Sequence, residues 1–402
     1  MQRDMALPWW KRMVALGSII TWMVWAYVRL MPPSTMIRHG QLLINRYNAW
    51  SYDHLAYSDV VKLYQTRFLF LHFVPYIQNR IEYPVVMGLF MWLTSLGHGV
   101  SLYFFITFSV FTMVALSVYF VMERLVPQQA IYFGVLPLLM VYGLLNWDLL
   151  GIGFMVFGWY GYKRHAYVPS AILFSLGVFA KLFPIFFLPF IATELWRTGQ
   201  RKTLGRMVVT FAVTAVVVNG PFILGNWKNW AYFFTFNAGR GLGADIYANP
   251  WIHGISTAAA NAFSLMVVVA TVLYFMWRVY RGGRVVEATA LSFTVFLIVN
   301  KVYSPQYTLW VFVLAILAEW PVWTYVVITL AGLTDYVNSF TVLQLLSTKS
   351  PSGRWYVDHV FFLGVLYRYL SLLVSGAGAA LTRQTAGRRS QNISLDAELP
   401  AS

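Results

Sequence analysis

The chain has 402 residues and a formal net charge of +15, and 59% of its residues are hydrophobic, 18% aromatic and only 11% charged. This composition excludes an ordinary soluble globular domain, and apolar runs from end to end indicate an integral, multi-pass membrane protein. The sequence contains no cysteine, which excludes disulfides, cysteine-ligated zinc and thiol catalysis.

The first apolar run, residues 13–31, is long enough to cross a membrane. It is followed by Pro32-Pro33 rather than by the small-residue site at which a signal peptide is cleaved. With a cytoplasmic N-terminus this run crosses outward. Residues 32–83 then form a polar external loop that we expect to contain short helices. Residues 83–97 are too short to span untilted, so we expect them to make one net inward passage together with residues 101–122.

The remaining apolar segments bring the prediction to about twelve crossings, with both termini cytoplasmic. The further segments are residues 130–145, 149–162, 168–180, 184–196, 207–224, 262–277, 288–299, 307–318, 322–340 and 356–375. Several are short for a hydrocarbon core of roughly 30 Å, so some are expected to end partway across. Residues 225–260 form a second external loop. Residues 1–380 thus make one all-α transmembrane domain, and residues 381–402 a disordered cytoplasmic tail.

The excess positive charge follows this topology. Most of it lies in short loops that the map places inside, which is the positive-inside pattern and argues against nucleic-acid binding. These groups are Lys11-Arg12, Lys163-Arg164, Arg197 with Arg201, Lys202 and Arg206, Arg278 with Arg281 and Arg284, and Arg383 with Arg388 and Arg389. Acids, amides and tyrosines instead fall on the outer side, which predicts a polar site that faces outward.

Residues 300–307 read Asn-Lys-Val-Tyr-Ser-Pro-Gln-Tyr, and apolar segments enclose them on both sides. Polar groups at membrane depth are costly, and a proline prevents the segment from passing as one plain helix. We interpret the segment as the wall of a polar site. The candidate binding residues in it are Asn300, Lys301, Tyr303 and Gln306.

A second lysine also precedes a helix-breaking proline, in Lys181-Leu-Phe-Pro184. Such a break frees backbone groups, and the lysine adds a positive charge in a setting of low dielectric constant. This combination suits a phosphate held at the membrane interface. The alternative is that the lysines extend toward the outer headgroups without binding a ligand.

Asp59 lies just beyond the first span, in Tyr57-Ser-Asp-Val-Val-Lys-Leu-Tyr64. A carboxylate close to the membrane surface can take a proton from an acceptor hydroxyl. The alternative is that Ser58 or Asp59 simply caps a helix. Asp53, six residues earlier, does not form an Asp-x-Asp pair with Asp59, so we predict no metal site here.

Three other motifs on the outer side have both a structural and a functional interpretation. Glu82-Tyr83-Pro84 suits the start of a helix, or contact with a sugar or acceptor. Asn146-Trp147-Asp148 suits a turn, or a site below the membrane surface. In the second external loop, glycines around Arg240 allow close approach of a ligand or mark a flexible loop, and His253 is a weak candidate.

These motifs, in their order and on their predicted side, resemble the family-87 glycosyltransferases. The resemblance rests on Tyr57 to Tyr64, Tyr83-Pro84, Lys181 to Pro184 and Asn300 to Tyr307, and spans roughly residues 10 to 340. The family comprises polytopic GT-C-type enzymes, including mannosyltransferases that use polyprenyl-phosphate mannose. The resemblance implies that Asp59 is the catalytic aspartate and that the lysine-proline segments line the lipid-phosphate donor site. One departure is Asn146-Trp-Asp148, where the family often carries Gly-Gln-x-Asn.

We therefore expect an inverting, metal-independent hexosyltransferase, with mannose favoured by the resemblance. It would use a polyprenyl-phosphate sugar as co-substrate, without a further cofactor, on the outer face of the cell membrane, and its acceptor would be a lipid, a glycan or a protein. The candidate residues for the donor phosphate are Lys181, Lys301, Tyr303, Gln306, Arg240 and His253. Those for the sugar or acceptor are Glu82, Tyr83, Asn146, Asp148 and Asn300. The rival hypotheses are a transporter or lipid flippase, and a structural subunit.

Overall fold

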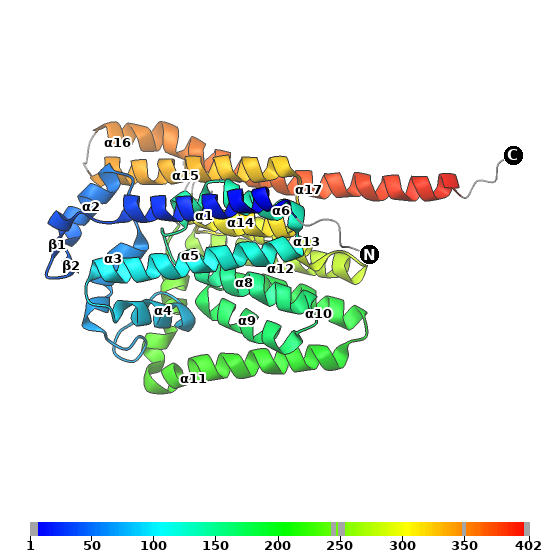
Figure 1. Ribbon diagram of the computed structural model, residues 1–402, viewed down its shortest axis with the longest axis horizontal. Helices are drawn as coiled ribbons and strands as arrows, with labels where there is room; N and C mark the ends of the chain where they lie inside the picture. The colour runs from blue at the N-terminus through cyan, green and yellow to red at the C-terminus, as the bar shows by residue number, and fades with distance from the viewer. Residues whose placement is uncertain (1–6, 243–246, 248–253, 348–350, 398–402) are drawn as a thin grey trace.

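The computed structural model describes residues 7–242, 247, 254–347 and 351–397. Within these residues the protein is almost wholly helical, and strands are confined to an antiparallel hairpin of β1 (Ile37–Arg38) and β2 (Gln41–Leu42). Most helices lie side by side along the long axis of the molecule (Figure 1). The hairpin and α2 lie at one end of the bundle, and the start of α1 and the end of α17 lie toward the other.

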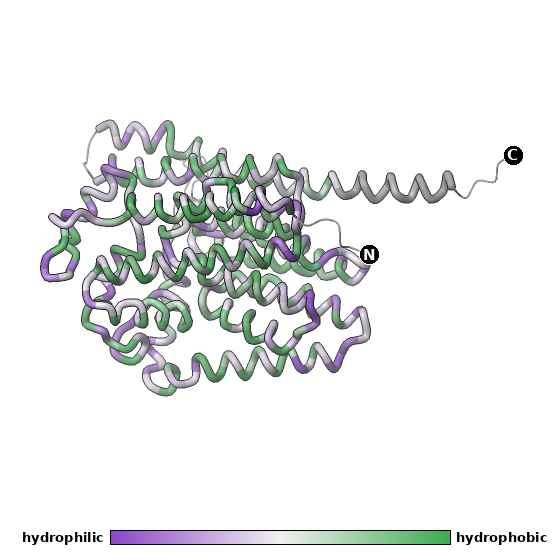
Figure 2. The backbone as a smooth tube through the Cα atoms, viewed as in Figure 1, coloured by the Kyte–Doolittle hydropathy of each residue, from purple (hydrophilic) through white to green (hydrophobic). Residues whose placement is uncertain are grey.

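Among the described residues, six helical segments are long and apolar enough to cross a membrane. They are α1 (Trp9–Leu30), α5 (Val100–Leu125), α11 (Arg201–Gly239), α12 (Thr257–Tyr280), α15 (Val322–Ser347) and the segment Gly353–Thr382, most of which belongs to α17 (Phe362–Ala397). Hydrophobic residues follow the lengths of the helices, and hydrophilic residues gather toward their ends (Figure 2). The expected all-α membrane protein is confirmed, while the twelve crossings and their direction stay predictions.

Shorter helices fill the space between these spans. They are α4 (Val85–Ser95), α6 (Pro127–Val135), α7 (Leu138–Tyr142), α8 (Asp148–Lys163), α9 (Tyr167–Ala180), η3 (Phe183–Phe187), α10 (Leu188–Arg197), α13 (Val285–Val299) and α14 (Tyr307–Leu317). The predicted segment 130–145 is two helices, because Leu136 adopts an extended conformation before Pro137. In α14 every residue from Thr308 to Leu317 is buried, so this helix lies at the centre of the bundle.

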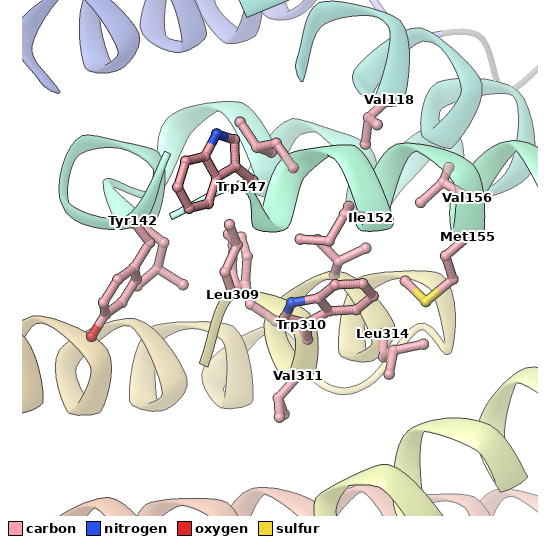
Figure 3. Packing of buried hydrophobic residues seen from close by; sticks show 14 of the residues in the cluster. Val118, Tyr142, Trp147, Ile152, Met155, Val156, Leu309, Trp310, Val311 and Leu314 are labelled. Atoms are coloured by element: carbon pink, nitrogen blue, oxygen red, sulfur yellow. The ribbon is translucent and has the colours of Figure 1, made fainter. Parts of the chain in front are cut away.

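The Trp310 side chain of α14 contacts the first turn of α8 and links the polar groups at these two helix starts. Ile152 and Met155 of α8 lie on the side toward Trp310 and Leu314 of α14 (Figure 3). Gly151 makes this approach possible, because a Cβ atom there would lie 2.8 Å from the Trp310 ring and 3.1 Å from Cβ of Lys181. A larger residue at position 151 would push the two helices apart.

The segment predicted as the first external loop, residues 32–83, contains η1 (Ser34–Met36), the hairpin, α2 (Ile44–Asp53), α3 (Asp59–Thr66) and η2 (Leu69–Leu71). Its short helices agree with the prediction, and its position outside the membrane stays a prediction. The hairpin was not predicted. Buried tyrosines fix the loop to the bundle: Tyr76, for example, donates to the carbonyl oxygen of Pro84 at 2.8 Å.

The second external loop begins later than predicted. Residues 225–239, expected to be loop, are helical and continue α11 beyond a kink at Asn226, where φ is −160° and ψ is 85°. The Nδ2 atoms of Asn226 and Asn229 each donate to the carbonyl oxygen of Ile77 at 3.2 Å. These bonds direct the end of α11 across the first loop. His253, in contrast, lies outside the described residues.

The C-terminal region comprises α16 (Pro351–Tyr356), the π-helix η5 (Val357–Phe361) and α17. α17 continues to Ala397, so helix covers most of the segment that was expected to be a disordered tail. An ion pair joins α15 to α17, with 2.8 Å between Asp335 and Arg368, and both side chains are buried.

Candidate active site

A cavity of about 690 Å³ is lined by the first loop, the start of α8, the two lysine-proline segments and the end of α11. Nine of the predicted residues are in its wall: Asp59, Glu82, Tyr83, Asn146, Lys181, Arg240, Asn300, Lys301 and Gln306. Residues separated by up to 247 positions in the sequence therefore meet in one site.

Three hydrogen bonds fix the position of Asp59 in this wall. Tyr57 donates its hydroxyl to Oδ1 at 2.7 Å, Asn146 donates Nδ2 to Oδ2 at 2.8 Å, and the backbone N–H of Asp59 donates to Leu145 at 2.8 Å. Burial raises the pKa of Asp59, while both side-chain hydrogen bonds and the charges of Lys181 and Lys62 lower it. A carboxyl group with a raised pKa is a better proton acceptor than an ordinary aspartate.

The helix-capping alternative for this segment is not what the side chains do. Ser58 is the N-cap residue of α3, but it makes no side-chain capping bond. Its hydroxyl instead donates to the carbonyl oxygen of Leu144 at 2.6 Å. Both Ser58 and Asp59 are thus used to join α3 to the residues that precede α8.

Lys181 ends α9 in an extended conformation, with φ −148° and ψ 133°, and is 8% exposed. Its Nζ atom lies 3.2 Å from Oδ1 of Asp148. The same atom lies 5.3 Å from the ring centre of Tyr83 and 5.8 Å from that of Tyr307. A side chain held between two rings and a carboxylate does not extend toward headgroups, so its charge stays in the cavity wall.

Lys301 is 7% exposed and is held differently. Its Nζ atom donates to the carbonyl oxygen of Ala238, near the end of α11, at 3.0 Å. The neighbouring Asn300 donates Nδ2 to the carbonyl oxygen of Val302 at 2.7 Å, which shapes the backbone before Pro305. The segment therefore brings a lysine, two amides and Ser304 to the wall.

Two of the predicted residues lie behind the wall rather than in it. Asp148 is 0% exposed and contacts Lys181 and Trp310. Tyr303 is buried, with its hydroxyl 2.8 Å from Oγ1 of Thr308 and the Arg368 guanidinium 3.9 Å from its ring centre. Neither side chain lines the cavity, but each contacts a residue that does, Asp148 contacting Lys181 and Tyr303 contacting Tyr307.

Sequence reasoning missed several residues of the wall. Arg67 forms a bidentate ion pair with Glu82, at 2.6 Å for each bond, and Lys62 and Thr66 accompany Asp59 on α3. The spacing of positions 59, 62, 63 and 66 places these side chains on one face of a helix, and this pattern could have found Lys62 and Thr66. The partner of Glu82 had no comparable local signal.

The cavity lining combines cations with aromatic residues. Among the described residues its cations are Lys62, Arg67, Lys181, Arg240 and Lys301, and its carboxylates are Asp59 and Glu82. Its large apolar residues include Leu182, Phe183, Phe233, Phe234, Phe236 and Phe296. An excess of positive charge beside aromatic rings suits an anion that carries an apolar group. In the part of the chain that the structure describes, no group of three or more His, Cys, Asp or Glu could hold a metal ion.

The model of glycosyltransferase family 87 matches residues 81–305, which is more than half of the chain. The chain belongs to glycosyltransferase family 87. No curated protein matches it. The family establishes a membrane glycosyltransferase, as predicted, and the match covers Asn146, Lys181 and Lys301. Asp59 precedes the matched residues, but it is hydrogen-bonded to Asn146 within them.

Proposed function

We propose that this glycosyltransferase transfers a hexose, with mannose as the first candidate, from a polyprenyl-phosphate donor to an acceptor hydroxyl on the outer face of the membrane. The observation that carries the proposal is the cavity itself, whose lining combines the partly exposed Asp59 carboxylate with several cations and aromatic rings. The aromatic and aliphatic side chains of the lining suit the hydrocarbon tail of a lipid donor.

In the proposed mechanism Asp59 takes the proton of the acceptor hydroxyl as its oxygen attacks the anomeric carbon of the sugar. The bond between that carbon and the phosphate oxygen breaks, and polyprenyl phosphate leaves with the electron pair. Attack from the face opposite the leaving group inverts the anomeric configuration. The hydrogen bonds from Tyr57 and Asn146 support this role, because they hold both oxygens of Asp59 in a defined orientation.

The leaving phosphate gains negative charge as the bond breaks, and fixed cations stabilise that charge best where water is excluded. Lys181 and Lys301 are both buried in the wall and are our candidates for this role, with Arg240 and Gln306 nearby. Asn300, Glu82 and Tyr83 are the candidates for the sugar and acceptor. The proposed orientation, with both termini cytoplasmic, gives this site access to donors on the outer leaflet.

The test is transfer by the purified protein in lipid nanodiscs, supplied with labelled polyprenyl-phosphate mannose and membrane glycolipid acceptors. We expect transfer from the lipid-linked sugar and none from GDP-mannose. Asp59→Asn should lower kcat by about a thousandfold, within the range that general-base catalysis contributes. Its Tm at neutral pH should not fall, because the substitution removes a desolvated charge whose pKa the fold raises.

Asp53→Asn is the matched control, because Asp53 is an exposed carboxylate of the same loop whose bond to Gln344 lies outside the cavity. It should leave the rate unchanged. Undiminished transfer by Asp59→Asn would show that Asp59 is not the base. Transfer from GDP-mannose alone would exclude the proposed donor, and lipid movement across liposomes without sugar transfer would favour a flippase.

A further inference from the structure

The segment 144–148, which leads into α8 and includes its first residue Asp148, contacts both halves of the proposed reaction centre. On one side they accept two hydrogen bonds from the start of α3. The Ser58 hydroxyl donates to the carbonyl oxygen of Leu144 at 2.6 Å, and the Asp59 backbone N–H donates to that of Leu145 at 2.8 Å. Asn146 then completes this side through its bond to the Asp59 carboxylate. The base is therefore held by three successive residues.

The orientation of the Asn146 amide is itself defined. Its Oδ1 atom accepts the backbone N–H of Trp147 at 2.7 Å, so Nδ2 faces the cavity. There Nδ2 donates to both Asp59 and the Tyr83 hydroxyl, each at 2.8 Å. A rotated amide would place an oxygen against the carboxylate, which electrostatic repulsion opposes.

Two residues later, Asp148 contacts the proposed leaving-group cation. Its Oδ1 atom lies 3.2 Å from Lys181 and accepts the indole N–H of Trp310 at 2.7 Å. Figure 3 shows Trp310 on α14 beneath α8, where Gly151 leaves room for the ring. Asp148 is wholly buried and touches no part of the cavity. Its charge compensates Lys181 from behind the wall.

We propose that Asn146 and Asp148 are positioning residues, and that the rigid segment 144–148 sets the separation between the base Asp59 and the cation Lys181. This inference rests on the proposed function and adds a separate role for each of the two residues. Asn146 orients the base, and Asp148 prevents Lys181 from pairing with Asp59 instead. A Lys181–Asp59 ion pair would occupy the carboxylate that must accept the proton.

The two residues should therefore change the pH dependence of kcat/KM in opposite directions. Asn146→Ala removes a hydrogen bond that lowers the pKa of Asp59, so the acidic limb of the profile should move to higher pH. Asp148→Asn removes a nearby negative charge and frees Lys181 to approach Asp59, so the acidic limb should move to lower pH. Residues with a purely structural role would change stability without displacing the limb.

A double-mutant cycle tests whether Asp148 acts through Lys181. In the wild-type background we expect Asp148→Asn to lower kcat for the polyprenyl-phosphate donor at least tenfold. In the Lys181→Gln background the same substitution should change kcat less than twofold, because the group that it positions is gone. The double variant carries no uncompensated buried charge, which favours its folding. If the fold-losses in kcat of Asp148→Asn and Lys181→Gln simply multiply in the double variant, the proposal is wrong.

Glu123→Gln is the matched control for removing one carboxylate of an ion pair. Glu123 pairs with Arg12 at 2.8 Å, away from the cavity, and its loss should leave kcat and the pH profile unchanged. If Asp148→Asn alone does not fold, the Asn146→Ala profile decides, and an unshifted acidic limb contradicts the proposal. One pair of results would reject this inference and leave the proposed function intact. In it Asp59→Asn abolishes transfer, while Asp148→Asn and Lys181→Gln lower kcat independently of each other.

Discussion

Lys181-Leu-Phe-Pro184 and Lys301-Val-Tyr-Ser-Pro305 share one sequence pattern, and the fold uses them differently. Lys181 has a buried carboxylate 3.2 Å away and two tyrosine rings around it. Lys301 has a backbone carbonyl, that of Ala238 at the end of α11. Lys181 is compensated in charge and held from three sides, whereas among the described residues Lys301 donates to one neutral acceptor.

The difference teaches that the partner of a buried lysine defines its role more than the motif around it does. Lys181 is attached to the centre of the bundle through Asp148 and Trp310, so its position is preorganised. Lys301 contacts a helix end that follows the kink at Asn226, so its position depends on that segment. We infer that Lys181 stabilises the transition state and that Lys301 mainly helps to bind the donor.

The largest expected effect is a difference in kcat between the glutamine variants of the two lysines. Lys181→Gln should lower kcat about a hundredfold or more, the usual loss when one preorganised charge-stabilising group is removed. Lys301→Gln should mainly raise KM for the lipid donor, about tenfold. Steady-state kinetics with labelled donor measures both effects. Equal losses of kcat in the two variants would contradict the assigned division.

Arginine substitutions should give a smaller contrast. Lys181→Arg retains the charge, but a planar guanidinium does not fit between the rings of Tyr83 and Tyr307 as an ammonium does, so kcat should fall about tenfold. Lys301→Arg can still donate to the Ala238 carbonyl oxygen and should lose about twofold. Comparable rates for both arginine variants would show that the rings do not constrain Lys181.

The smallest effect is a displacement of the pH profile. Lys181 lowers the pKa of Asp59 through its charge, so Lys181→Gln should raise that pKa and move the acidic limb of kcat/KM to higher pH. Protonated Asp59 cannot accept the acceptor proton, so activity is lost as pH falls through the raised value. Lys301→Gln should leave the limb in place. A shift in the Lys301 variant would mean that both charges influence the base.

Much of the helical framework could be predicted from the sequence, because long apolar runs and prolines report directly on spans and breaks. The position of Asp59 in an ordered loop was also predictable from the first span and the polarity that follows it. The extension of α11 past Asn226 was not, because Gly225 and Asn226 are typical loop residues, and the bonds of Asn226 and Asn229 to Ile77 are tertiary contacts that the local sequence does not indicate.

The pairings inside the site could not be predicted from local patterns. Asp148 and Lys181 are 33 positions apart, and Arg67 and Glu82 are 15 apart, on elements whose relative placement depends on the whole bundle. A turn motif at Asn146-Trp147-Asp148 gave no sign that its two polar side chains face different partners. Such information resides in tertiary packing, for which a single sequence carries no signal.

The buried pair between α15 and α17 has a consequence for synthesis of the protein. Asp335 leaves the ribosome 33 residues before Arg368, so α15 enters the membrane with an acid that its own helix cannot neutralise. An uncompensated carboxylate within a span costs roughly 2.5–3.5 kcal/mol during insertion. Insertion of α17 brings Arg368 to Asp335 and removes that cost, so we expect stable assembly to require this helix. Chains truncated before Arg368 would retain most of the cavity wall, yet should be poorly inserted and degraded.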